Sequence, residues 1–247
     1  MSHLSKRSYS LKLFCFPHAG GFSLYYGFLQ KYEYRNIDRI FLFDYPRNSF
    51  KFSGAPTDFK QYTDAAVDYI RTNKAKGDPY MLFGHSMGAF IACEAALAMQ
   101  NDFGDSPAGV VVSGQNPPYA VTQGKLREMP KDLYAFAKEL GGVPQKILDN
   151  KKMCERLYRF AEADMKAVAA YQPTKTTPEK RLKCGMLLQG SDDMIVDPKF
   201  HNDWDKTFQN IFMDKVFDGG HFYFNNQSEQ IAPLLDQYAG AMSREAH

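Results

Sequence analysis

The chain has 247 residues, of which 44% are hydrophobic and 23% charged, and its formal net charge is +2. This length and composition predict one globular domain over residues 1–247 with a single sizeable core. The small net charge gives no field that favours nucleic acid, and no run approaches the ~18 apolar residues that span a bilayer. Neither nucleic acid nor a membrane is therefore expected as a partner.

The first apolar run, Leu11 to Phe16, is interrupted by Lys12 and stops at Pro17, so it is too short for a signal peptide. The cysteines are widely spaced and form no CxxC pair, and three of them lie in apolar segments typical of buried thiols. They are Cys15, Cys93, Cys154 and Cys184. A reducing cytoplasm is the expected location.

Short apolar runs rich in β-forming residues recur along the chain and predict strands. They cover residues 11–16, 39–43, 80–83, 109–113, 186–189 and 211–217. Helical patterns lie between them, including 59–72 and 87–99, and the second of these is apolar on nearly all sides. The alternation predicts an α/β fold with a mostly parallel sheet covered by helices on both faces.

The alternation fails between residues 113 and 182, where no convincing strand is found. Pro130 begins a helical stretch with apolar residues at i, i+3, i+4 and i+7, and Gly141-Gly142 ends it. Residues 153–171 predict a longer amphipathic helix, with Met153, Leu157 and Phe160 on its apolar side. We predict a helical insertion over approximately 114–181 that forms a lid over the carboxyl edge of the sheet.

The sequence Gly84-His-Ser86-Met-Gly88 runs from a predicted strand directly into a predicted helix. This context is typical of a nucleophile elbow, in which a tight turn holds the serine hydroxyl clear of the sheet. A glycine-rich turn capped by serine is the alternative. We favour Ser86 as nucleophile, with the Met87 N–H at the helix start as a donor to a negative oxygen.

A serine hydroxyl needs a base, and elbow hydrolases supply an acid and then a histidine later in the chain. His221 follows the last predicted strand and two glycines, whereas His85 lies in the elbow and should point away from the hydroxyl. The acid is expected in the turn after residue 189, where Asp192 and Asp193 are both candidates.

A second oxyanion donor is expected from the loop after the first strand. Residues 16–21 form such a loop, and its small residues let the backbone approach the site closely. The Ala19 N–H is the expected donor beside that of Met87.

Four patches of this sequence resemble the type II thioesterases of non-ribosomal peptide and polyketide synthesis, which have the α/β-hydrolase fold. They are LFCFPHAGG (13–21), GHSMGA (84–89), GSDDMIV (190–196) and FDGGHF (217–222). The resemblance covers nearly the whole chain, and its spacing selects Asp193 over Asp192 as the triad acid with Ser86 and His221.

The resemblance implies hydrolysis of acyl or aminoacyl thioesters on the phosphopantetheine arm of a carrier protein, with no metal or cofactor of its own, by an enzyme expected to be a monomer. Two alternatives stay open at this stage: an esterase or medium-chain fatty-acyl thioesterase of the same fold, and a non-enzymatic scaffold. For the carrier, Lys152, Arg156 and Arg159 at i, i+4 and i+7 are the candidate docking cations.

Overall fold

The computed structural model describes residues 11–46, 58–122, 131–143 and 145–245. Its described residues form a six-stranded sheet in the order β2-β1-β3-β4-β5-β6, and every neighbouring pair is parallel. The strands are β1 (Leu11–Phe16), β2 (Ile37–Leu42), β3 (Tyr80–His85), β4 (Gly109–Ser113), β5 (Leu182–Gly190) and β6 (Phe208–Phe217). The predicted α/β fold with a parallel sheet is confirmed.

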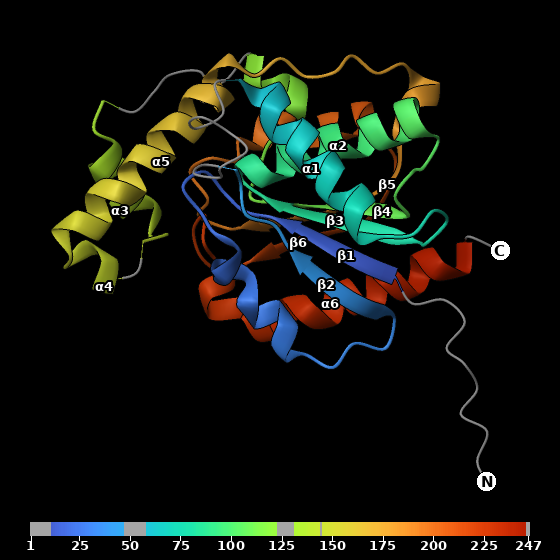
Figure 1. Cartoon of the computed structure of the whole chain (residues 1–247), viewed down its shortest axis with the longest axis horizontal. Helices are drawn as coiled ribbons and strands as arrows, with labels where there is room; N and C mark the ends of the chain where they lie inside the picture. The colour runs from blue at the N-terminus through green and yellow to red at the C-terminus, as the bar shows by residue number, and fades with distance from the viewer. Residues whose placement is uncertain (1–10, 47–57, 123–130, 144, 246–247) are drawn as a thin grey trace, which may run out of the picture.

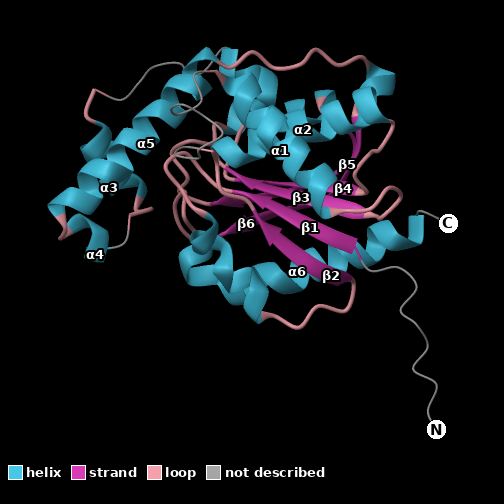
Figure 2. Cartoon of the chain, in the orientation of Figure 1, coloured by secondary structure: helices cyan, strands magenta, loops and turns pink. Residues whose placement is uncertain are grey.

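Helices cover both faces of this sheet (Figures 1 and 2). On one face lie α1 (Phe59–Asn73) and α2 (Met87–Phe103), and on the other lie the 3-10 helix η1 (Ser23–Lys31) and the final helix α6 (Phe224–Glu245). A further 3-10 helix, η5 (Pro198–Lys206), connects β5 to β6. Parallel strands buried between two helical layers explain the near-continuous apolar runs of the central strands.

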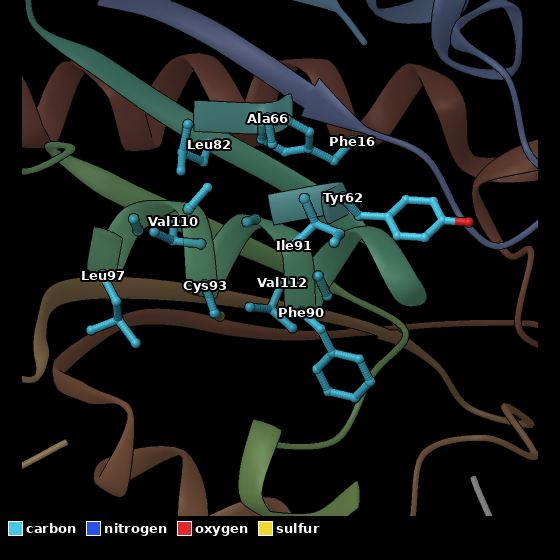
Figure 3. Close-up of a cluster of buried hydrophobic side chains, with 14 of the residues drawn as sticks. Phe16, Tyr62, Ala66, Leu82, Phe90, Ile91, Cys93, Leu97, Val110 and Val112 are labelled. Carbon is cyan, nitrogen blue, oxygen red and sulfur yellow. The ribbon is translucent and has the colours of Figure 1, made fainter. Parts of the chain in front are cut away.

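Helix α2 is the central helix of the core. Twelve of its seventeen residues are buried, because it packs on the sheet with one side and on α1 and Tyr171 with the others. Figure 3 shows Phe90, Ile91 and Cys93 of α2 beside Val110 and Val112 of β4. A helix that is apolar all round belongs in such a position, and its burial fixes the turn that precedes it.

The predicted insertion between β4 and β5 contains η2 (Pro118–Thr122), α3 (Leu133–Leu140), α4 (Gln145–Leu148), α5 (Lys151–Ala170) and η4 (Pro178–Lys180). We use "helical insertion" for α3, α4 and α5, which lie together beyond the carboxyl ends of the strands (Figure 1). Asp132 caps α3 by accepting the Ala135 N–H at 2.9 Å, and Gly141 ends it in the left-handed conformation. Pro130 lies outside the described residues.

Two sequence expectations need correction. Met153 does not lie on the apolar side of α5: it is 52% exposed, and the buried side carries Cys154, Leu157 and Ala161 instead. Strands β5 and β6 begin earlier than predicted, since Lys183 interrupts the apolar run of β5 and the edge strand β6 exposes many of its side chains.

Within the described residues, no helix combines the length and the apolar character required to cross a membrane. All four cysteines are free thiols, and all are buried.

Candidate active site

Ser86 lies in the tight turn between β3 and α2. Its φ of 56° and ψ of −120° are exceptional, because no other described residue except glycine has a positive φ. Such a conformation costs on the order of 1–3 kcal/mol and persists only where the surroundings enforce it. The Ser86 N–H donates to the Ser113 carbonyl at 2.9 Å, which ties the turn to β4.

The two glycines of the elbow are required by space. A Cβ on Gly84 would lie 2.0 Å from the Gly88 carbonyl oxygen, and a Cβ on Gly88 would lie 2.1 Å from that of Phe16. The backbones of the turn, of α2 and of β1 therefore meet without intervening side chains. This contact is the structural reason for the Gly-x-Ser-x-Gly pattern.

His221 and Asp193 form a buried pair at the carboxyl edge of the sheet. The His221 Nδ1 lies 2.9 and 3.0 Å from the two Asp193 carboxylate oxygens, and the residues are 3% and 7% exposed. The Ile195 N–H donates to Asp193 Oδ1 at 2.9 Å. Asp192 is exposed and accepts from the Ser191 hydroxyl instead. The structure thus brings Asp193, and not Asp192, against His221.

Ser86 and His221 line one cavity together with Ala19 of the loop after β1. The space measures about 700 Å³ including its open mouth. Its other walls are mostly apolar and come from the helical insertion, including Leu133, Phe136, Ala137, Leu140, Leu157 and Met165. Met87 contributes no side chain to the cavity: it is buried as the first residue of α2, which leaves only its backbone N–H for a role there.

The loop that carries Ala19 is attached to the helical insertion through Asp164. This carboxylate is fully buried on α5; it accepts the Gly20 N–H at 2.7 Å and the Tyr62 hydroxyl at 2.6 Å. Sequence reasoning missed Asp164, although a signal was present. Asp164 lies seven residues after Leu157 and four before Val168, which places it on the same buried face of α5. A carboxylate on such an apolar face needs buried hydrogen-bond donors.

Two further histidines lie close to His221. The His85 ring centroid is 4.7 Å from that of His221, and His85 Nδ1 lies 2.9 Å from the Ser113 hydroxyl oxygen. Burial, together with the nearby His221 and His18 rings, holds the pKa of His85 well below its ordinary value, so this imidazole is neutral. His18, which the sequence analysis did not single out, also lines the cavity and packs against Phe222.

The described residues contain no group of three or more His, Cys, Asp or Glu side chains that could hold a metal ion. Ser86, His221 and His18 line the cavity, and the Asp193 carboxylate, which does not line it, is hydrogen-bonded to His221. Their arrangement can activate a hydroxyl for attack on an acyl carbon.

A thioesterase domain family model matches residues 11–238. Phenyloxazoline synthase MbtB of Mycobacterium tuberculosis is 28% identical over 226 residues, which are 89% of this chain but only 15% of that protein. A probable cadicidin biosynthesis thioesterase of Streptomyces griseus is 26% identical over 231 residues, 92% of this chain and 62% of the relative. The chain thus spans less than two thirds of the length of these curated relatives.

Among solved structures, YbtT, a type II thioesterase from the yersiniabactin NRPS/PKS pathway, superposes with a TM-score of 0.77 at 20% identity. The superposition covers 97% of this chain and 96% of YbtT. The family model extends from β1 into α6 and so includes every residue of the site described above. The resemblance to the family is confirmed at this level: the chain has the α/β-hydrolase fold and belongs to the thioesterase domain family.

Proposed function

We propose that this protein hydrolyses acyl or aminoacyl thioesters from the phosphopantetheine arms of carrier proteins in non-ribosomal peptide or polyketide synthesis. One observation carries the proposal: Ser86 and the buried His221–Asp193 pair meet at a cavity whose other walls are mostly apolar. The reacting groups suit acyl transfer, and the walls suit an acyl chain. The pathways named for YbtT and for the cadicidin thioesterase support the same substrate class.

In the proposed reaction, the Asp193 carboxylate accepts a hydrogen bond from His221 Nδ1–H, which keeps the proton on Nδ1 and leaves Nε2 free to act as the base. Nε2 takes the proton of the Ser86 hydroxyl, and Oγ attacks the thioester carbonyl carbon. The Ala19 and Met87 N–H groups stabilise the resulting oxyanion. The carbon–sulfur bond then breaks, and the departing thiol of the arm takes the proton from His221.

The second half-reaction releases the acid. Water attacks the acyl-serine, His221 removes its proton, and the same proton returns to Ser86 Oγ as the ester bond breaks. These steps use only side chains and backbone of this chain, so the proposal requires no metal or cofactor. The phosphopantetheine arm belongs to the substrate.

The helical insertion is proposed to act as a lid and to receive the carrier. Lys152, Arg156 and Arg159 are exposed on α5. The Arg156 guanidinium lies 5.6 Å from the centre of the Phe160 ring, and that ring packs at 5.9 Å on Phe22, next to the loop of Ala19. Arg156 thus lies beside Phe160. The three cations suit an acidic carrier surface near the cavity.

Mass spectrometry of carrier-bound acyl chains, before and after addition of the enzyme, tests this function. We expect loss of the acyl group from carriers and a higher kcat/KM for acyl-carrier thioesters than for p-nitrophenyl esters of the same chain length. The Ser86→Ala variant is the control. If esters are hydrolysed and carrier thioesters are not, the protein is instead an esterase of the same fold.

A further inference from the structure

The segment 113–116, which begins at the last residue of β4, lies against the active site although it supplies no reacting atom. The Ser113 carbonyl accepts the Ser86 N–H, and the Ser113 hydroxyl lies 2.9 Å from His85 Nδ1 and 2.6 Å from the Tyr223 hydroxyl. The segment is therefore in contact with the elbow and with residues adjoining both Ser86 and His221.

Gly114 brings this segment's backbone directly against the acid–base pair. Its φ is +57°, and a Cβ there would lie 3.1 Å from Asp193 Oδ2 and 3.2 Å from His221 Nδ1. The Gly114 N–H donates to the Leu188 carbonyl of β5 at 2.8 Å. Any side chain would be strained and would press on both groups of the pair.

Asn116 binds the loop that carries the acid. It is 6% exposed; its Nδ2 donates to the Ile195 carbonyl and its Oδ1 accepts the Asp197 N–H, both at 2.8 Å. The side-chain amide thus pairs with the loop as a neighbouring strand would. Ile195 is held at both ends, because its N–H donates to Asp193 and its carbonyl accepts from Asn116.

The first half of the acid loop is bound to the loop of His221, because the Ser191 N–H donates to the Phe217 carbonyl at 2.8 Å and the Asp192 N–H to the Gly219 carbonyl at 2.9 Å. Ser191 and Asp192 are exposed, and Met194 is 53% exposed, while Asp193 points inward to His221. The two bonds from the buried Asn116 amide hold the second half of the loop, beyond Asp193. A buried hydrogen-bonding group that loses its partner is costly, because it cannot bond to water instead.

We propose that Asn116 is a positioning residue for the reaction: through Ile195 it holds the Asp193 carboxylate in the geometry that orients His221. This inference rests on the proposed serine hydrolase chemistry, but not on the identity of the substrate. Asn116 does not line the cavity, whereas Ile195 does, so the test has to separate an effect on Asp193 from an effect on the cavity wall.

The test compares Asn116→Ala with the unmodified enzyme on one p-nitrophenyl ester and one acyl-carrier thioester. We expect kcat to fall about tenfold or more with KM within twofold, because the loss concerns the orientation of the base and not binding.

A double-mutant cycle separates positioning from a general structural role. In an Asp193→Asn background, Asn116→Ala should lower kcat/KM by less than about twofold, because the group it positions is gone. Asn116→Ser, which can form only one of the two bonds, should give an intermediate loss if the alanine variant folds poorly. Asn73→Ala is the matched control. It removes a hydrogen bond from the Asn73 side-chain amide to the Tyr69 carbonyl on α1, and we expect no change in kcat.

Three results would overturn the proposal. The first is an unchanged kcat, and the second is an equal loss of kcat/KM in the Asp193→Asn background. The third is a fall in kcat that disappears when the rate is divided by the fraction of enzyme molecules that a fluorophosphonate labels. If the ester responds as expected but the carrier thioester is not a substrate at all, the positioning role stands and only the proposed substrate class fails.

Discussion

Helices α2 and α3 both serve the same cavity, yet they are held in opposite ways. Twelve residues of α2 are buried, so the turn that carries Ser86 is fixed by the core (Figure 3). None of the residues of α3 is buried, although Leu133, Phe136 and Leu140 line the cavity. Ser86 thus adjoins a buried core helix, whereas part of the cavity wall stands on a helix that costs less free energy to move.

The largest effect is expected at Ser86, in the turn that precedes α2. Ser86→Ala should lower kcat for thioester hydrolysis by about 10⁴-fold or more, because the covalent nucleophile is lost. The melting temperature should stay within a few degrees, since alanine occupies the same strained turn. Near-normal turnover would mean that the acyl-enzyme route through the elbow is wrong.

Asp193→Asn should cost about 10³- to 10⁴-fold in kcat, because the amide cannot stabilise the imidazolium or select its tautomer. The neighbouring Asp192→Asn is the matched control and should change kcat less than twofold, since Asp192 is exposed and bonded to Ser191. Steady-state kinetics on one substrate decide between them. A larger loss for Asp192→Asn would require a different acid.

The contrast between the two helices can be measured with one truncation in each. Ile91→Ala in α2 should lower the free energy of unfolding by about 2–5 kcal/mol, because Ile91 is fully buried. Leu140→Ala in α3 should cost less than about 1.5 kcal/mol but should shift kcat/KM toward longer acyl chains, since it widens the cavity. Urea unfolding and a chain-length series test both. Equal stability losses would refute the difference in anchorage.

A smaller effect is expected from the surface of the helical insertion. Charge reversal of Lys152, Arg156 and Arg159 should raise KM for acyl-carrier substrates about three- to tenfold, because it repels an acidic partner. Turnover of a free acyl thioester should not change. Reversal of Lys180 and Lys183, near the amino end of β5 and away from the cavity, is the control. An unchanged KM for carriers would place docking elsewhere.

The smallest effect concerns the pH dependence of stability. Because the pKa of His85 is depressed in the folded state, the unfolded chain binds one more proton below the ordinary value of about 6.5. Stability is therefore lost as pH falls through that value, by about 1 kcal/mol between pH 7 and 5.5. His85→Gln should remove this contribution. If the free energy of unfolding changes with pH by the same amount in the two proteins over this range, His85 is not held neutral in the folded state.

The sequence was most informative where one local pattern is sufficient. The elbow could be placed from two glycines around a serine, and α3 from an apolar period that ends at Gly141. The long helix α6 was not predicted, and neither were the first residues of β5 and β6, because burial there is set by neighbours distant in the chain. Periodicity alone does not contain that information.

The same limit applies to the site. Asp193 could be selected by family spacing, whereas its supports could not: Asn116 meets the acid loop across 79 residues, and Asp164 meets Gly20 across 144. Asn116 stands in an unremarkable Gln-Asn-Pro-Pro sequence. Only the pairing of β4 with β5 brings it beside Ile195.

The burial of all four cysteines has a practical consequence for trapping the enzyme with its partner. Cys15, Cys93, Cys154 and Cys184 are between 0% and 6% exposed, and burial raises the pKa of the Cys15 and Cys93 thiols. A Ser86→Cys variant would therefore carry one solvent-accessible thiol, at the mouth of the cavity. A carrier whose arm ends in a haloacetyl group should alkylate that sulfur alone, which would yield a homogeneous covalent complex without removal of any native cysteine.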